Sequence, residues 1–255
     1  MRILLTNDDG INAPGLDVLA KIAADLSDDV WTVAPETDQS GQSRSLTLHE
    51  PLRLRTLGER TFAVKGTPTD SVIMAVRHVM ADKLPDLVLS GVNCGQNAAD
   101  DVTYSGTIAA AMEGTQLGIP SVALSLAWGE GGRESMHWET PMAHGAGVIR
   151  TLLSAGWPKN VLMNVNFPAV APDAVKATRV VRQGSRDQSG LSIIDRMDGR
   201  GSSYYWYGFT RHTSTPASNT DLAALGDATI AVTPLHLDLT HDQSMTELAS
   251  VFDGS

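Results

Sequence analysis

The sequence predicts an α/β fold of the Rossmann-like kind, built on a doubly wound, mostly parallel sheet. Over residues 1–126, short apolar β-prone segments alternate with segments whose apolar residues recur at helical spacing. Polar loops rich in Gly, Asn and Asp follow several of the β-prone segments. Strands that alternate with helices favour parallel pairing through right-handed crossovers, so this order predicts the fold class.

The elements of the first half follow from these patterns. We expect strands of the main sheet at residues 2–6, 30–34, 87–89 and 122–126. Shorter β-prone segments predict a small β-excursion at residues 46–49, 52–54 and 62–64. Apolar residues at helical spacing predict helices at residues 16–26, 67–80 and 105–114. Pro68 fits an early helical position, because proline lacks the N–H that the first turn leaves unpaired anyway.

The second half has weaker signals. We expect a loop at residues 128–133, helices at 143–153 and 246–252, and strands at 161–167 and 230–233. Residues 179–182 and 204–207 predict the two arms of a β-hairpin around a polar, aperiodic stretch. The predicted division is a core at residues 1–183 and an extension at 184–255. This extension holds the hairpin and the C-terminal helix, and it returns the strand at 229–235 to the core.

Charge and composition exclude several classes of partner. The chain has 255 residues and a formal net charge of -10, so its mean field repels nucleic-acid backbones and anionic membranes. We therefore expect no nucleic-acid polymer and no membrane as a partner. Cys94 is the single cysteine, which excludes an internal disulfide and a thiolate-rich zinc site and fits a cytoplasmic location. No apolar run approaches the length of a membrane span.

Polar loops at the predicted strand ends carry the candidate chemistry, because ligands bind beyond the carboxyl ends of strands in an open parallel sheet. Asp8 and Asp9 follow the first strand, and two adjacent carboxylates repel any phosphate unless a cation lies between them. Mg²⁺ and Mn²⁺ prefer oxygen ligands, and Ser40 and Asn93 could supply neutral oxygens from neighbouring loops. Asp9-Gly10 is also a common turn, so the pair alone leaves both interpretations open.

A second polar segment could bind an anion. Ser105 can cap the helix that begins near Gly106, and a glycine there lets a phosphate approach the backbone closely. The hydroxyl groups of Ser105 and Thr107, together with the free N–H groups of the first turn, could then hold the phosphate. An ordinary helix cap would explain the same three residues, so this motif is also open when taken alone.

Short motifs follow one another in a specific order along the chain. They are Asn7-Asp8-Asp9-Gly10, Ala34-Pro35, Ser40-Gly41, Gly66-Thr67-Pro68-Thr69-Asp70, Ser90-Gly91-Val92-Asn93-Cys94-Gly95, Tyr104-Ser105-Gly106-Thr107, Ala111-Met112-Glu113-Gly114 and Thr233-Pro234-Leu235-His236. Taken together, they resemble the SurE family of survival-protein nucleotidases. The matches are dense up to residue 126 and patchy after it.

The resemblance implies a 5'/3'-nucleotidase that acts on nucleoside monophosphates, with exopolyphosphatase activity as a further expectation. One divalent ion per subunit, Mg²⁺ or Mn²⁺, is expected at Asp8, Asp9, Ser40 and Asn93. The substrate phosphate is expected at Asn97, Ser105, Gly106 and Thr107. The expected catalytic residues are Asp8, Asp9, Asn97 and Ser105. The resemblance further implies a homodimer or homotetramer formed through swapped C-terminal elements.

The mechanism that we hypothesise is in-line attack of water on a phosphate beside a divalent ion. A variant makes Asp8 or Asp9 the nucleophile, which would form an aspartyl phosphate. A haloacid-dehalogenase-like phosphatase needs one residue between its two aspartates, whereas here they are adjacent. A dinucleotide-dependent oxidoreductase would place a glycine fingerprint after the first strand. A nucleotide-binding protein without catalysis stays as an alternative.

Overall fold

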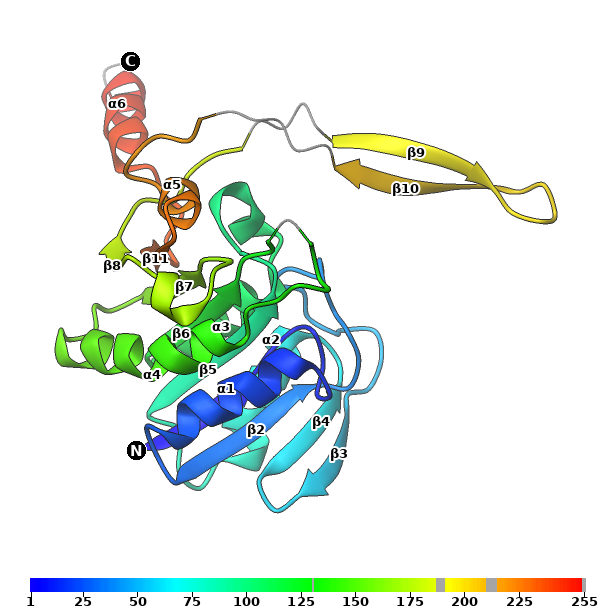
Figure 1. Ribbon diagram of the computed structural model, residues 1–255, viewed down its shortest axis with the longest axis vertical. Helices are drawn as coiled ribbons and strands as arrows, with labels where there is room; N and C mark the ends of the chain where they lie inside the picture. The colour runs from blue at the N-terminus through cyan, green and yellow to red at the C-terminus, as the bar shows by residue number, and fades with distance from the viewer. Residues whose placement is uncertain (130, 187–190, 210–214, 254–255) are drawn as a thin grey trace.

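The computed structural model describes residues 1–129, 131–186, 191–209 and 215–253. Figure 1 shows a central sheet with helices on both of its faces and a long hairpin arm that projects away from this body. The predicted α/β class, with its mostly parallel sheet and C-terminal hairpin, is confirmed. No helix in the described ranges combines the length and the apolar character that a membrane crossing requires.

The main sheet has the strand order β3-β4-β2-β1-β5-β6-β7-β11-β8. Neighbouring strands are parallel except in the β3–β4 and β7–β11 pairs, which are antiparallel. The strands are β1 (Arg2–Thr6), β2 (Asp29–Pro35), β3 (Arg53–Gly58), β4 (Thr61–Lys65), β5 (Leu87–Cys94), β6 (Ser121–Leu126), β7 (Val161–Phe167), β8 (Ala177–Val180) and β11 (Thr229–His236). The arm pairs β9 (Leu191–Met197) with β10 (Ser203–Phe209) in antiparallel register.

Helices bury the two faces of the sheet in separate cores. The larger core joins Ile3 and Leu5 of β1 to α1 and α4, whereas Leu4 points into the core under α2. Successive side chains of a strand point to opposite faces of the sheet, which explains this alternation. Each fully buried Ile or Leu stabilises the fold by about 1.5–3 kcal/mol relative to an exposed one. The helical elements are α1 (Pro14–Ala24), α2 (Pro68–Met74), η1 (Ala75–Val79), η2 (Ala99–Thr103), α3 (Gly106–Gln116), α4 (Glu139–Ser154), η3 (Pro172–Ala174), α5 (Asp221–Gly226) and α6 (Asp242–Asp253).

The strand order reverses at β1. From β1 the chain passes first to β2 on one side and later to β5 on the other, with parallel pairing on both sides. Such a reversal opens a crevice beyond the carboxyl ends of the two strands, because the connections leave in opposite directions. The loop after β1, which carries Asp8 and Asp9, therefore meets the end of β5, which carries Asn93, at this crevice. Ser40 lies in the loop after β2.

The predicted hairpin partners are wrong. Residues 177–180 form β8, which pairs in parallel with β11 at the edge of the main sheet. The true partner of β10 is β9, which lies inside the stretch that was expected to lack regular structure. All seven residues of β9 are exposed in the chain, so β9 has no buried face. Its sequence therefore lacks the alternation of apolar and polar residues that indicates a half-buried strand.

Two other local predictions are also wrong. Residues 46–49 form no strand. The backbone N–H and the hydroxyl of Thr47 instead donate to Asp70 in the first turn of α2. The helix expected to run to residue 80 changes after Met74 into the π-helical turn η1. The short helix α5 and the 3₁₀ helix η2 were not predicted, because each is too short to show a helical period.

Asp70 joins the start of α2 to the neighbouring loop. It forms a capping box with Thr67, whose backbone N–H donates to Oδ2 of Asp70 at 2.9 Å. The hydroxyl group of Thr47 donates to the same oxygen at 2.6 Å, and the Thr47 N–H donates to Oδ1 at 3.2 Å. One buried carboxylate therefore satisfies donors from two segments of the chain.

We predict that Asp70→Ala lowers the free energy of unfolding by about 2–4 kcal/mol. The change removes a helix cap and leaves the donors of Thr47 without an acceptor. Urea denaturation followed by circular dichroism measures the loss. The control is Asp17→Ala, an exposed acid in the first turn of α1. A loss no larger than that of the control would contradict the prediction.

Candidate functional site

The side chain of Asn7 fixes the turn after β1. The amide of Asn7 donates to the carbonyl of Gly10 at 2.8 Å and accepts the Gly10 N–H at 3.2 Å. Gly10 has a φ of +100°, and a Cβ there would lie 3.0 Å from the backbone carbon of Thr37. Glycine is therefore required for both its conformation and its space. The clamp fixes the backbone on both sides of Asp8 and Asp9.

Asp8 is a buried carboxylate, with 4% of its surface exposed. Burial raises its pKa from the usual 3.8 to about 6, since water no longer solvates the charge. The Thr107 hydroxyl donates to Oδ1 and opposes this shift, while the charge of Asp9 adds to it. Asp8 thus carries an electrostatic cost that a cation would relieve.

Asp9 is half-buried and lies beside Cys94. Its Oδ2 accepts the backbone N–H of Cys94 at 3.2 Å, which ties the β1 loop to the end of β5. Burial raises the pKa of Asp9 and the N–H of Cys94 lowers it. The nearby charge of Asp38 raises the pKa further, and that of Arg133 lowers it. Two other charged side chains therefore act on this carboxylate.

The two predicted neutral ligands differ in their surroundings. Asn93 donates its amide to the carbonyl of Gly95 at 2.8 Å, and its Oδ1 accepts no hydrogen bond from a described residue. Ser40 is exposed, and its N–H donates to Oδ1 of Asp38 at 2.8 Å. The next N–H back along the chain, that of Gln39, donates to the carbonyl of Asp8 at 2.8 Å. This bond joins the Ser40 loop to the β1 loop.

The N-terminus of α3 packs directly on Asp8. A Cβ at Gly106 would lie 2.7 Å from the Cβ of Asp8, so only glycine allows this approach. The Ser105 hydroxyl accepts the N–H of Ile108 at 3.1 Å and caps the helix, while its own proton remains available for donation. The Thr107 proton is committed to Asp8. In this arrangement Ser105 can donate to an anion, and Thr107 orients the carboxylate.

Asn97 belongs to a buried amide network. Its side chain donates to the Ser125 hydroxyl at 2.9 Å, and its backbone N–H donates to Oδ1 of Asn166 at 2.9 Å. The amides of Asn164 and Asn166 both donate to its carbonyl. These bonds fix the loop after β5 against β6 and β7. The role of Asn97 as a phosphate contact stays a prediction, and its amide is already paired.

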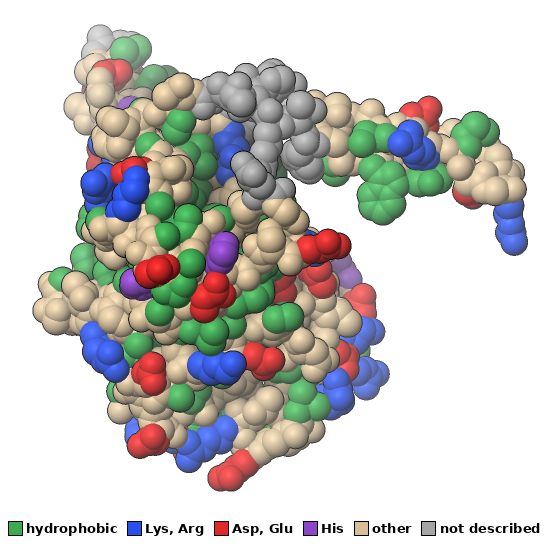
Figure 2. Space-filling model, in the orientation of Figure 1, with side chains coloured by type: hydrophobic (Ala, Val, Ile, Leu, Met, Phe, Trp, Pro, Cys, Tyr) green, Lys and Arg blue, Asp and Glu red, His purple; other side chains and the backbone are tan. Residues whose placement is uncertain are grey.

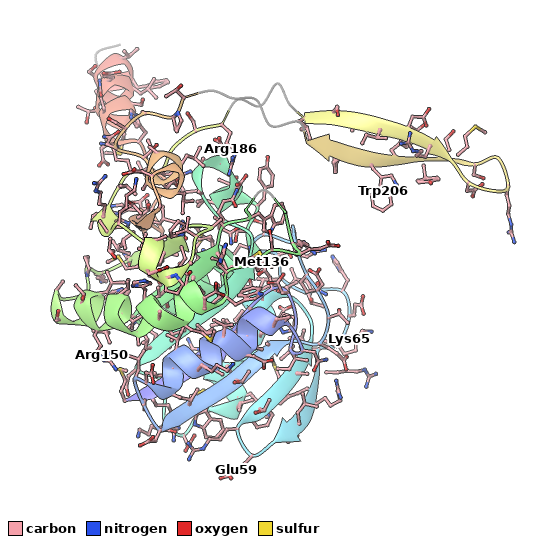
Figure 3. All side chains as sticks on the ribbon, viewed as in Figure 1. Glu59, Lys65, Met136, Arg150, Arg186 and Trp206 are labelled. Atoms are coloured by element: carbon pink, nitrogen blue, oxygen red, sulfur yellow. The ribbon has the colours of Figure 1, made fainter. Side chains whose placement is uncertain are left out.

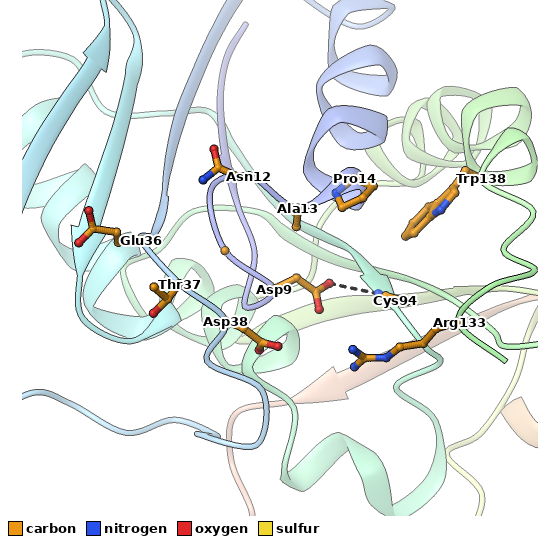
Figure 4. Close-up of a pocket in the computed structure, with 12 residues that line it drawn as sticks. Asp9, Asn12, Ala13, Pro14, Glu36, Thr37, Asp38, Cys94, Arg133 and Trp138 are labelled. Atoms are coloured by element: carbon orange, nitrogen blue, oxygen red, sulfur yellow. Dashed lines mark hydrogen bonds between the residues drawn. The ribbon is translucent and has the colours of Figure 1, made fainter.

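A cavity of about 530 Å³ opens at this edge of the sheet (Figure 4). Of the predicted site residues, Asp9 lines it and Asp8 is buried next to it. The other predicted site residues are not part of this lining: Ser40, Asn93, Asn97, Ser105, Gly106 and Thr107. Within the described ranges, no cluster of three or more His, Cys, Asp or Glu side chains could hold a metal ion. A metal here would need the two carboxylates and neutral oxygens, as the sequence predicted.

The lining residues that were not predicted include Asp38, Arg133 and Trp138. Asp38 lies in the long polar loop after β2, where the sequence indicated only Ser40. Arg133 and Trp138 belong to the segment between β6 and α4, whose sequence has no period and no recognisable motif. A charged residue in a glycine-rich loop was the one available signal for Arg133.

Comparison with known proteins assigns the family. The sequence profile described as "Survival protein SurE" matches residues 3–190 of the chain. The chain belongs to the SurE family. A protein named 5'-nucleotidase SurE from Methylobacterium nodulans is 59% identical over 252 residues, covering 99% of this chain and 100% of that protein. A protein of the same name from Parvibaculum lavamentivorans is 56% identical, covering 97% of this chain and 90% of that protein.

A solved structure from the SurE family also matches the fold. The crystal structure of the SurE protein from Aquifex aeolicus has a TM-score of 0.85 to this chain at 36% sequence identity. The match covers 98% of this chain and 99% of that one. The family resemblance that the motifs predicted is therefore confirmed by sequence and by structure.

We predict that the metal-free protein becomes less stable as the pH rises from about 4 to about 7. Folded Asp8 holds its proton more tightly than the unfolded chain does, because its folded pKa of about 6 exceeds the usual 3.8. Stability is therefore full below the unfolded pKa and falls as the pH rises through the folded pKa. The whole effect is about 3 kcal/mol.

Urea unfolding in EDTA at both pH values measures this effect for the wild type and for Asp8→Asn. The asparagine variant can still accept the Thr107 hydrogen bond but carries no charge. Its unfolding free energy should fall less than that of the wild type over the same range. Equal pH slopes for the two proteins would contradict the prediction.

Proposed function

We propose that the protein is a nucleotidase, a hydrolase that removes phosphate from nucleoside 5'- and 3'-monophosphates with a bound Mg²⁺ or Mn²⁺. The observation that carries this proposal is the pair of adjacent carboxylates, Asp8 and Asp9, held beside the N-terminus of α3 at the reversal of strand order. The name 5'-nucleotidase, which the relatives share, supports nucleotides as the substrate class. Polyphosphate hydrolysis and a cytoplasmic location stay predictions.

The donor set fits a hard divalent cation. Two carboxylates with raised pKa values gain most from a neighbouring positive charge. The Oδ1 atoms of Asp9 and Asn93 accept no hydrogen bond from a described residue, so they are available as ligands. Asp8, Asp9, Ser40 and Asn93 would hold the ion. When bound, it would supply the positive charge that stabilises the phosphate as water attacks.

The chain itself contributes an anion site at α3. Gly106 lets the first turn of α3 pack on Asp8, so a phosphate bound beside this carboxylate would lie at the positive end of the helix. Ser105 can donate its hydroxyl proton to a phosphate oxygen. This end of the helix and Ser105 would hold the equatorial oxygens, where negative charge is spread during transfer. Thr107 keeps Asp8 oriented throughout.

We predict that phosphate release from AMP requires Mn²⁺ or Mg²⁺ and stops in excess EDTA. Asp8→Asn and Asp9→Asn should each lower kcat by at least about 100-fold, because each removes a charge that holds the cation. A colorimetric phosphate assay measures the rates. The matched control is Asp17→Asn, which makes the same exchange of a carboxylate for an amide in an exposed acid on α1.

Near-normal rates in both site variants would overturn the metal proposal. Binding of AMP without release of phosphate would instead indicate a nucleotide-binding protein that lacks catalysis. Rapid quenching with labelled substrate separates the two chemical routes. A phosphorylated protein that disappears in the Asp8 or Asp9 variant would indicate an aspartyl phosphate in place of direct attack by water.

The proposal includes an oligomer formed through the C-terminal elements. The arm carries exposed apolar and aromatic side chains, and Figures 2 and 3 show such side chains along it. The most exposed of them are Ile193, Met197, Tyr205, Trp206 and Tyr207, each more than 60% exposed. A lone two-stranded hairpin is marginally stable in water, and a large apolar patch marks an interface.

A second copy of the chain fits this arm best, because the family resemblance implies a homodimer or homotetramer and a two-fold axis would exchange the two arms. Helix α6 is also fully exposed, with Met245, Leu248 and Val251 among its apolar residues. Association would bury the apolar residues of the arm and of α6, which are exposed in the single chain.

We predict that the double variant Tyr205→Ser/Trp206→Ser dissociates the oligomer at micromolar concentration. Trp and Tyr side chains are common anchors of protein interfaces, so loss of these two should weaken the association strongly. Sedimentation velocity measures the mass. The double variant Ser202→Ala/Ser203→Ala at the start of β10 is the control. A wild-type protein that sediments as a monomer would remove this part of the proposal.

A further inference from the structure

The segment between β6 and α4 forms one wall of the cavity. Trp128 packs against Gly95 in the loop after β5, where a Cβ would lie 3.0 Å from the indole ring. The guanidinium of Arg133 lies over this ring, 5.8 Å from its centroid, within the range of a cation–π contact. Trp128 is thus a fixed platform that holds the arginine at the edge of the cavity.

Acidic side chains outnumber basic ones in the described lining of the cavity. The described lining contains Asp9, Glu36 and Asp38, and Arg133 is its single cation. Figure 4 shows the guanidinium of Arg133 directed toward the carboxylates of Asp9 and Asp38. Among the described residues, Arg133 forms no ion pair with either carboxylate and donates no hydrogen bond.

No described residue accepts a hydrogen bond from any of the five donors of Arg133. Stacking on Trp128 uses the face of the guanidinium and leaves its N–H groups free in the plane. Two parallel N–H groups match two phosphate oxygens, and the charge persists at every pH at which the protein is folded. An arginine that served only to balance Asp9 or Asp38 would gain more by forming a direct ion pair with one of them.

We propose that Arg133 is a substrate-binding residue that holds the phosphate group of the phosphomonoester through its guanidinium. This inference rests on the proposed function and adds the residue that recognises the substrate anion from the segment between β6 and α4. It also explains how a dianion enters a cavity lined by three acids. Other interpretations are that Arg133 balances the acids or stacks on the nucleobase.

The test compares Arg133→Gln and Arg133→Lys with Arg77→Gln, an exposed arginine outside the cavity lining. Steady-state kinetics use AMP and p-nitrophenyl phosphate, which has no nucleobase. Arg133→Gln should raise KM about 10- to 100-fold for both substrates, because it removes a charge-assisted bidentate contact. Arg133→Lys should recover part of this loss, and Arg77→Gln should match the wild type.

A second readout does not depend on turnover. Calorimetric titration with inorganic phosphate, in the presence of Mn²⁺, should show at least about 10-fold weaker binding to Arg133→Gln. Titration with Mn²⁺ alone gives the metal affinity. Thermal unfolding checks that each variant is folded, which is expected because Arg133 is exposed.

Three results would overturn the inference. The first is unchanged KM for both substrates, together with unchanged affinity for phosphate. The second is tighter Mn²⁺ binding with unchanged phosphate affinity, which would mean that Arg133 balances the acids. The third is a loss confined to AMP, which would mean that it contacts the nucleobase.

The inference and the proposed function can fail separately. If the wild-type protein binds phosphate but releases none from AMP, the proposal that it is a nucleotidase is wrong. The calorimetry would then still show whether Arg133 binds phosphate. A wild-type protein that binds neither phosphate nor AMP would remove both. Normal turnover with unaffected Arg133 variants would remove only the inference.

Discussion

Burial of the adjacent carboxylates of Asp8 and Asp9, at the end of a buried strand, is the constraint to which the surrounding structure responds. Water cannot solvate these charges fully, so the pKa of each is raised. Each carboxylate accepts a hydrogen bond from the chain: the Thr107 hydroxyl donates to Asp8, and the Cys94 N–H donates to Asp9. These bonds offset part of the cost. A divalent cation, under the proposed function, would offset the rest.

The loops around this pair are fixed by buried polar networks that reach other strands. The amides of Asn97, Asn164 and Asn166 tie the loop after β5 to β7, and Asp70 ties residue 47 to the start of α2. Each network satisfies its donors away from water, which is the condition under which buried polar groups stabilise a unique arrangement. The crevice is thereby held open by rigid supports, as precise positioning of a substrate requires.

The body and the arm differ in how they are stabilised. The body buries apolar residues on both faces of the sheet, so it can fold by the burial available within one chain. In the described part of the arm, β9 and β10 pair only with each other, and every residue of β9 is exposed. Trp206 contacts the ring of Tyr204 on the same strand but stays 64% exposed. Association of two copies would give both arms a buried face.

The sequence by itself determined the α/β class, the family and the position of Asp8 and Asp9, because strand and helix periods and contiguous motifs are local properties of the chain. Only the tertiary structure decided that β10 pairs with β9, since pairing depends on register between segments that carry no alternation. It alone brought Arg133 and Asp38 to the cavity that Asp9 lines. Those side chains come from loops separated by about a hundred residues, and no local pattern encodes a distance across the sheet.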